Sequence, residues 1–192
     1  MVASLTLVWI ALLAFLATNL DDLVVLTTFA GHESYSRFEL LVGQYLGFGA
    51  LVFASVVAGV GLAGLIAAHV RWLGIAPVVI GVHWLWRETG RSATTNGATT
   101  DGPLTRIGTI AGVGVANGGD NIAVYVPLVA VLDHGATAFV VSVFLVVAGG
   151  WVLLADWLAG RPVLADRVGA HGDVLVPVVL IALGVSILAG LI

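Results

Sequence analysis

The amino-acid sequence predicts an all-α membrane protein in which six transmembrane helices form two inverted repeats of three helices each. Three observations lead to this prediction: an apolar composition, six long apolar runs, and one polar segment halfway along the chain. Of the 192 residues, 60% are hydrophobic and 9% are charged, and the mean hydropathy is +1.12. No water-soluble domain has such a composition, so we expect an integral membrane protein with little mass outside the bilayer.

Each apolar run approaches or exceeds the roughly 20 residues that a helix needs to cross a bilayer. The first is expected to be a span and not a cleaved signal peptide, because no basic residue precedes it and the run continues past any plausible cleavage point. The predicted spans are 5–30, 38–66, 71–87, 107–131, 136–158 and 173–192.

The polar segment Thr89–Thr105 is rich in Gly, Ser and Thr, as flexible linkers are. It divides the chain into a first three-helix repeat over residues 1–88, a cytoplasmic linker over 89–106 and a second repeat over 107–192. The arginines set the orientation, because cytoplasmic connections carry an excess of basic residues. Only Arg71 lies in an even-numbered connection, so both termini are expected outside. The odd-numbered connections hold Arg37, Arg87, Arg91, Arg106, Arg161 and Arg167.

Short matching segments indicate the internal repeat. Asp21-Asp22-Leu23-Val24-Val25 aligns with Asp120-Asn121-Ile122-Ala123-Val124, and Gly81-Val82-His83-Trp84-Leu85 aligns with Gly184-Val185-Ser186-Ile187-Leu188. With three spans in each half, the second half is inverted relative to the first. Inverted repeats with polar, glycine-interrupted segments at corresponding places are typical of secondary transporters whose binding site lies near the middle of the membrane.

Carboxylates within these spans are the main functional signal. A charged side chain at the centre of a membrane helix costs about 2.5–3.5 kcal/mol, so such groups face an interior and find partners. Gly118-Gly119 favours a helix break just before Asp120, and we expect two broken helices to meet there. Carboxylate and amide oxygens suit hard divalent cations. The predicted cation ligands are Asp21, Asp120, Asp22, Asn19, Asn117 and Asn121.

Asp21 and Asp22 are expected to differ in role, because neighbouring side chains on a helix point about 100° apart. We favour Asp21 as the direct ligand because it aligns with Asp120. Without a cation the carboxylates repel one another, which suggests exchange of the cation for protons. The alternative is structural: these polar residues cap broken helices or form hydrogen bonds between spans.

Three further residues are candidates for lining the pathway: Gln44, Tyr45 and His83. Gly43 and Gly47 around the first two also fit a helix-packing face, and His83 also fits an interface position beside tryptophans. Cysteine is absent and the one methionine is Met1, so sulfur ligands are excluded. No catalytic motif, cofactor-binding motif or basic patch for nucleic acid is present, so neither an enzyme nor a cofactor is expected.

Three segments resemble the bacterial cadmium resistance transporter family, which belongs to the LysE-type exporter superfamily. They are Ala17-Thr18-Asn19-Leu20-Asp21-Asp22-Leu23, Val42-Gly43-Gln44-Tyr45-Leu46-Gly47 and Asp120-Asn121-Ile122-Ala123-Val124-Tyr125-Val126-Pro127. The resemblance implies six spans in a bacterial plasma membrane and heavy-metal efflux. The superfamily also contains manganese, nickel/cobalt, calcium and amino-acid exporters. Cadmium favours sulfur ligands, whereas the oxygens of this chain suit manganese or calcium.

From these observations we expect export of divalent heavy-metal cations of the cadmium type, coupled to protons, from a site near the middle of the bilayer. The expected partners are the cation, protons and lipid, and the glycines permit a homodimer. The alternatives are a manganese or other hard divalent cation exporter, a cationic amino acid exporter, and a membrane accessory protein that carries no cargo.

Overall fold

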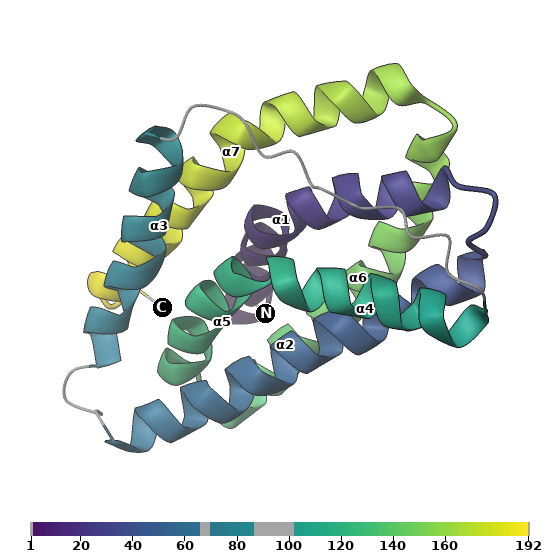
Figure 1. Cartoon of the computed structure of the whole chain (residues 1–192). Coiled ribbons are helices and arrows are strands. Elements are labelled where there is room, and N and C mark those ends of the chain that lie inside the picture. The colour runs from purple at the N-terminus through teal and green to yellow at the C-terminus, as the bar shows by residue number, and fades with distance from the viewer. Residues whose placement is uncertain (1, 66–69, 87–101, 192) are drawn as a thin grey trace.

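The computed structural model describes residues 2–65, 70–86 and 102–191, and in these residues the chain is helical with no strand (Figure 1). The predicted all-α class is confirmed for this part of the chain. Residues 89–101 of the expected linker lie outside the described residues. The elements are α1 Val2–Ala30, α2 Arg37–Leu65, the 3-10 helix η1 Val70–Gly74, α3 Ile75–Trp86, α4 Pro103–Asn117, α5 Gly119–Val131, α6 His134–Ala159 and α7 Pro162–Leu188.

Three of the described helices are long and apolar enough to cross a membrane by length and composition: Leu5–Ala30, Arg37–Ala63 and His134–Ala159. They correspond to the predicted first, second and fifth spans. Helix α7 begins at Pro162, well before the predicted start at 173, because a proline suits the first turn of a helix. The described residues also include shorter apolar helices over Arg71–His83, Gly119–Val131 and Val176–Leu188.

The predicted fourth span is two helices, because α4 ends at Asn117, α5 begins at Gly119, and Gly118 lies between them. Gly118 is pressed against α2, and a Cβ at this position would overlap the side chain of Leu51. The break expected from Gly118-Gly119 is therefore present. The expectation of a second broken helix is wrong, because α1 runs without interruption through Asn19 and Asp22. No glycine or proline interrupts α1 to weaken its helix there.

The helices pack in pairs that join the two halves of the chain. Helix α1 packs against α6 and α7, α2 packs against α4 and α5, and α3 packs against α7 (Figure 1). An aromatic cluster lies between α1, α2, α5 and α6. The Phe15 ring centroid is 5.3 Å from those of Phe48 and Trp151, and the Tyr125 centroid is 4.4 Å from that of Phe144. This cluster forms the core beneath the polar residues described below.

Ion pairs join the start of α2 to the second half of the chain. Oε1 of Glu39 accepts hydrogen bonds from Nε and Nη2 of Arg106 at 2.9 and 2.7 Å. Its Oε2 accepts from the backbone nitrogen and the hydroxyl of Ser36, which forms a capping box. Arg37 pairs with Asp156 on α6 at 2.7 Å. The start of α2, the start of α4 and the second half of α6 therefore lie at the same end of the molecule.

Close backbone packing of α7 against η1 and the first turn of α3 leads to a stability prediction. A Cβ on Gly184 would lie 2.5 Å from the carbonyl oxygen of Gly74 and 2.9 Å from the amide nitrogen of Val78. Gly184→Ala should therefore lower the free energy of unfolding by about 1–3 kcal/mol, as overpacking does. Thermal unfolding of the purified protein in detergent measures this effect.

Gly61→Ala on α2 is the matched control, because a Cβ at Gly61 would meet nothing within 4 Å. It should leave the thermal midpoint unchanged or raise it slightly, since alanine favours a helix over glycine by up to about 1 kcal/mol. Equal midpoints for the two variants would contradict the tight contact between α3 and α7.

Candidate functional site

A cluster of buried polar side chains lies where α1 crosses α5. Asn19 is 0% exposed, Asp22 is 4% exposed and Asp120 is 7% exposed. Thr18 and Asn121 are buried beside them, and the hydroxyl of Tyr125 is directed into the same cluster. Burial of this many polar groups in an otherwise apolar core is costly unless they bind one another or a ligand.

Asp22 and Asp120 are the two carboxylates that the fold brings together. The side chain of Asn117 lies near the Asp22 carboxylate, and the charges of Asp21 and Asp120 both lie close enough to repel that of Asp22. Asn117 ends α4 and Asp120 lies in the first turn of α5, so the break at Gly118 places both of them against α1. Oδ1 of Asp120 also accepts a hydrogen bond from the backbone nitrogen of Asn121 at 3.0 Å.

Asp21 occupies a different position from the one we favoured for it. It is half-buried at the edge of the helix face that Asp22 occupies, and its Oδ1 accepts from the backbone nitrogen of Asp22 at 3.0 Å. Over the part of the chain that the structure describes, no group of three or more His, Cys, Asp or Glu side chains could hold a metal ion. The deep carboxylates of the cluster are therefore a pair, and the other buried side-chain oxygens beside them belong to asparagine, threonine and tyrosine.

The Asn19 amide is oriented by its neighbours. Its Nδ2 lies 2.9 Å from the backbone oxygen of Phe15, 2.9 Å from the Tyr125 hydroxyl and 3.2 Å from Oδ1 of Asn121. Its Oδ1 is buried and has no hydrogen-bond partner. An unpaired buried carbonyl oxygen costs about 1–3 kcal/mol, so this atom is suited to accept a hydrogen bond from water or to bind a cation.

The structure adds residues that the sequence did not single out. The hydroxyls of Thr18 and Tyr125 lie 2.7 Å apart, and Nε1 of Trp151 donates to the backbone oxygen of Asn19 at 2.7 Å. The available signal was local: Thr18 precedes Asn19, and Tyr125 lies one helical turn after Asn121. Trp151 gave no local signal, because it is 132 residues from its partner.

Of the three pathway candidates, Gln44 lies near the polar cluster, whereas Tyr45 and His83 lie away from it. The position of Gln44 follows from the packing of its helix. Phe48 packs on Phe15, and the two helices run in opposite senses across the connection 31–36 (Figure 1). Gln44, one turn before Phe48, therefore lies at about the level of Asn19, and its Nε2 is buried without a hydrogen-bond partner. Tyr45 faces α6, where it donates to the backbone oxygen of Leu145, and His83 is exposed near the end of α3.

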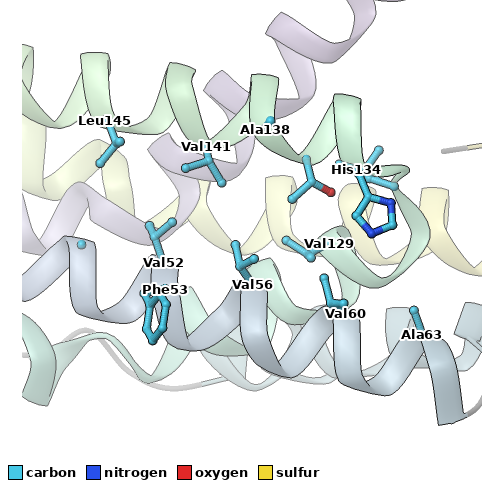
Figure 2. Close-up of a pocket in the computed structure, with 13 residues that line it drawn as sticks. Val52, Phe53, Val56, Val60, Ala63, Val129, His134, Ala138, Val141 and Leu145 are labelled. Atoms are coloured by element: carbon cyan, nitrogen blue, oxygen red, sulfur yellow. The ribbon is translucent and has the colours of Figure 1, made fainter.

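An apolar groove of about 810 Å³ lies between α2, α5 and α6, away from the polar cluster. Figure 2 shows Val52, Val56 and Val60 facing Val141 across it, with His134 at one end. No carboxylate lines this groove, so it does not suit a cation.

Comparison with known protein families gives one finding. The model of a family described as "Cadmium resistance transporter" matches residues 15–190. No curated protein and no solved structure matches the chain. The matched residues contain every member of the polar cluster.

Proposed function

The chain belongs to the cadmium resistance transporter family, and from this premise we propose that it exports divalent heavy-metal cations through a site at Asp22 and Asp120. The observation that carries the proposal is the burial of these two carboxylates within repelling distance of each other. A divalent cation between them would neutralise both charges, whereas an empty site leaves two like charges in an apolar interior.

The proposed ligands are oxygens, in keeping with this charge balance. Asp22 and Asp120 supply carboxylates, and the unpartnered Oδ1 of Asn19 supplies an amide oxygen. Asn117 contacts Asp22 and can supply a further oxygen. Oδ1 of Asn121 lies 3.2 Å from Nδ2 of Asn19, which suits a supporting role.

The packing of the helices supports the proposed inverted repeat over residues 1–88 and 107–192. In the proposed repeat, α1 corresponds to α4–α5, α2 to α6 and α3 to α7. Under this correspondence, the contact of α1 with α6 matches the contact of α4–α5 with α2. The same correspondence maps the α3–α7 contact onto itself. A site between the two halves at a helix break is the arrangement by which inverted-repeat transporters alternate access across the middle of the bilayer.

We further propose that the end of the molecule marked by Arg37 and Arg106 faces the cytoplasm of a bacterial cell, with both termini outside. The ion pairs place these two arginines at one end, as the excess of basic residues on the cytoplasmic side requires. Protons are the proposed counter-substrate, because protonation would relieve the repulsion in the empty Asp22–Asp120 pair.

A manganese-type cation is the second candidate substrate. The observation that favours it is the absence of sulfur: the chain has no cysteine, and Met1 is its one methionine. Soft cations such as cadmium prefer thiolate ligands, whereas carboxylate and amide oxygens suit harder cations. Weak binding to oxygen would however help an exporter to release cadmium.

Transport into proteoliposomes that contain the purified protein tests the function and its alternatives. Uptake of Cd²⁺, Mn²⁺, Zn²⁺ and Ca²⁺ is measured against protein-free liposomes, and lysine and arginine are tested in parallel. We expect uptake of at least Cd²⁺ or Mn²⁺. Uptake of the amino acids alone would show that the substrate is a cationic amino acid, whose ammonium group the carboxylates bind, and not a metal cation. No uptake of any solute would favour an accessory protein.

Proton coupling gives a separate prediction in the same vesicles. A pH gradient that drives protons opposite to the cation should accelerate cation uptake several-fold, and a protonophore should abolish the acceleration. A pH-sensitive dye inside the vesicles should report proton movement only when the cation is added. Cation uptake that is insensitive to both the gradient and the protonophore would rule out protons as the counter-substrate.

A further inference from the structure

We propose that Tyr125 and Thr18 are positioning residues, which hold the Asn19 amide so that its oxygen, and not its nitrogen, is presented to the transported cation. This inference rests on the proposed function, because it concerns how one oxygen of the same site is oriented. It adds to the site two hydroxyl groups that contribute no ligand of their own.

The hydrogen bond to Phe15 identifies the two atoms of the Asn19 amide. Nδ2 of Asn19 lies 2.9 Å from the backbone oxygen of Phe15, and a backbone carbonyl only accepts hydrogen bonds. The atom on this side of the amide must therefore be the nitrogen. The oxygen then lies on the other side, where it is buried and has no hydrogen-bond partner.

The neighbouring carbonyl of Ala14 sets the direction of the hydroxyl hydrogens of Thr18 and Tyr125. The Thr18 hydroxyl lies 3.0 Å from the backbone oxygen of Ala14, to which it donates its one hydrogen. Since that hydrogen is used, Tyr125 donates to Thr18 across their 2.7 Å contact. The Tyr125 oxygen then accepts from Nδ2 of Asn19 at 2.9 Å, and the Thr18 oxygen lies at the same distance from Nδ2. The chain runs in one direction, from Asn19 through Tyr125 and Thr18 to a carbonyl oxygen.

These hydrogen bonds hold the Asn19 amide in one orientation. If the Asn19 amide rotated by half a turn, its oxygen would face the lone pairs of both Phe15 and Tyr125. The hydrogen-bond chain opposes this rotation, and the Tyr125 ring is fixed in turn by Phe144 and Phe48, at centroid distances of 4.4 and 6.2 Å. An amide oxygen held in advance binds a cation without the cost of ordering it.

Transport kinetics of Cd²⁺ and Mn²⁺ in proteoliposomes test this role. Tyr125→Phe keeps the ring and removes the hydroxyl, and Thr18→Val keeps the shape and removes the other hydroxyl. Each should raise KM for the transported cation about 3- to 10-fold, as the loss of one hydrogen bond does, with the maximum rate within about twofold of wild type. Because both variants break the same chain, the double variant should raise KM less than the product of the two single effects.

Two controls separate positioning from a general effect on the fold. Thr18→Ser restores a hydroxyl and should return KM to near the wild-type value. Tyr35→Phe removes a hydroxyl from a tyrosine that packs on Phe29 and His32, outside the cluster, and should leave KM unchanged.

The outcomes distinguish this inference from the function on which it rests. If wild-type protein transports neither cation, the proposed function fails and the inference with it. If wild-type protein transports and Tyr125→Phe and Thr18→Val both keep the wild-type KM, the inference alone is overturned. The same holds if both variants lose thermal stability and maximum rate at an unchanged KM, because their role is then structural.

Discussion

Asp120→Asn should lower cation export about 100-fold, to near the background of membranes without the protein. The substitution keeps the size of the side chain and removes one of the two deep negative charges, so a divalent cation would be left partly uncompensated in an apolar interior. A contact to a charged group contributes about 1.5–3 kcal/mol, which corresponds to about 10- to 150-fold in binding. Asp22→Asn should have an effect of the same size, because Asp22 is equally deep in the cluster. Initial rates of cation uptake into proteoliposomes, corrected for the amount of inserted protein, measure both.

Asp21→Asn is the matched control for these two variants. It makes the same chemical change at the neighbouring position, but Asp21 is half-buried at the edge of the face that Asp22 occupies. Export should therefore fall at least tenfold less in Asp21→Asn than in Asp22→Asn. A larger loss of export in Asp21→Asn than in Asp22→Asn would show that Asp21 is the direct cation ligand, as its alignment with Asp120 first suggested. Full export by Asp120→Asn would remove the carboxylate pair from the mechanism.

Glu39→Gln is expected to have the largest effect on stability, a decrease of about 3 kcal/mol in the free energy of unfolding. The Glu39 side chain is 5% exposed, and both of its oxygens are engaged, one by Arg106 and one by Ser36. Removal of the charge leaves the guanidinium of Arg106 partly buried without its counter-ion, which typically costs 3–5 kcal/mol for a fully buried pair. The expected loss of stability lies at the lower end of this range because the Arg106 side chain is 21% exposed. Thermal or denaturant unfolding in detergent measures the change.

Arg37→Gln breaks the other ion pair at the same end and serves as the comparison. The Arg37 side chain is 74% exposed, and exposed pairs contribute about 0–1 kcal/mol. A loss of stability in Arg37→Gln as large as that in Glu39→Gln would show that burial does not distinguish the two pairs.

The residues that interrupt or charge an apolar run were readable from the sequence. Gly118-Gly119 predicted the helix break, because glycine lowers the local stability of a helix wherever it occurs. Asp22, Asp120, Asn19 and Asn117 were identifiable as side chains that would meet in the interior, because polar side chains in apolar spans must find partners. The resemblance of three short segments to the cadmium resistance transporter family was confirmed over residues 15–190.

The rotation of α1 about its own axis was not readable. Apolar residues surround Asp21 and Asp22 on all sides of this helix, so no amphipathic pattern tells which of the two faces the interior. The alignment of short repeat segments pointed to Asp21, whereas the packing of α1 against its neighbours places Asp22 at the centre of the buried face. A shift of one residue in such an alignment changes the direction of the predicted side chain by about 100° around the helix axis.

By itself, then, the sequence determined the membrane class, the helical content, the break at Gly118 and the set of polar residues that must meet, because each of these follows from the composition of a local segment. Only the tertiary structure decided that Asp22 is the carboxylate of α1 that joins Asp120, and that the hydroxyl of Tyr125 lies against Thr18 and the Asn19 amide. The physical reason is that these choices depend on contacts between side chains about 100 residues apart, whose geometry is set by how helices rotate and pack against one another.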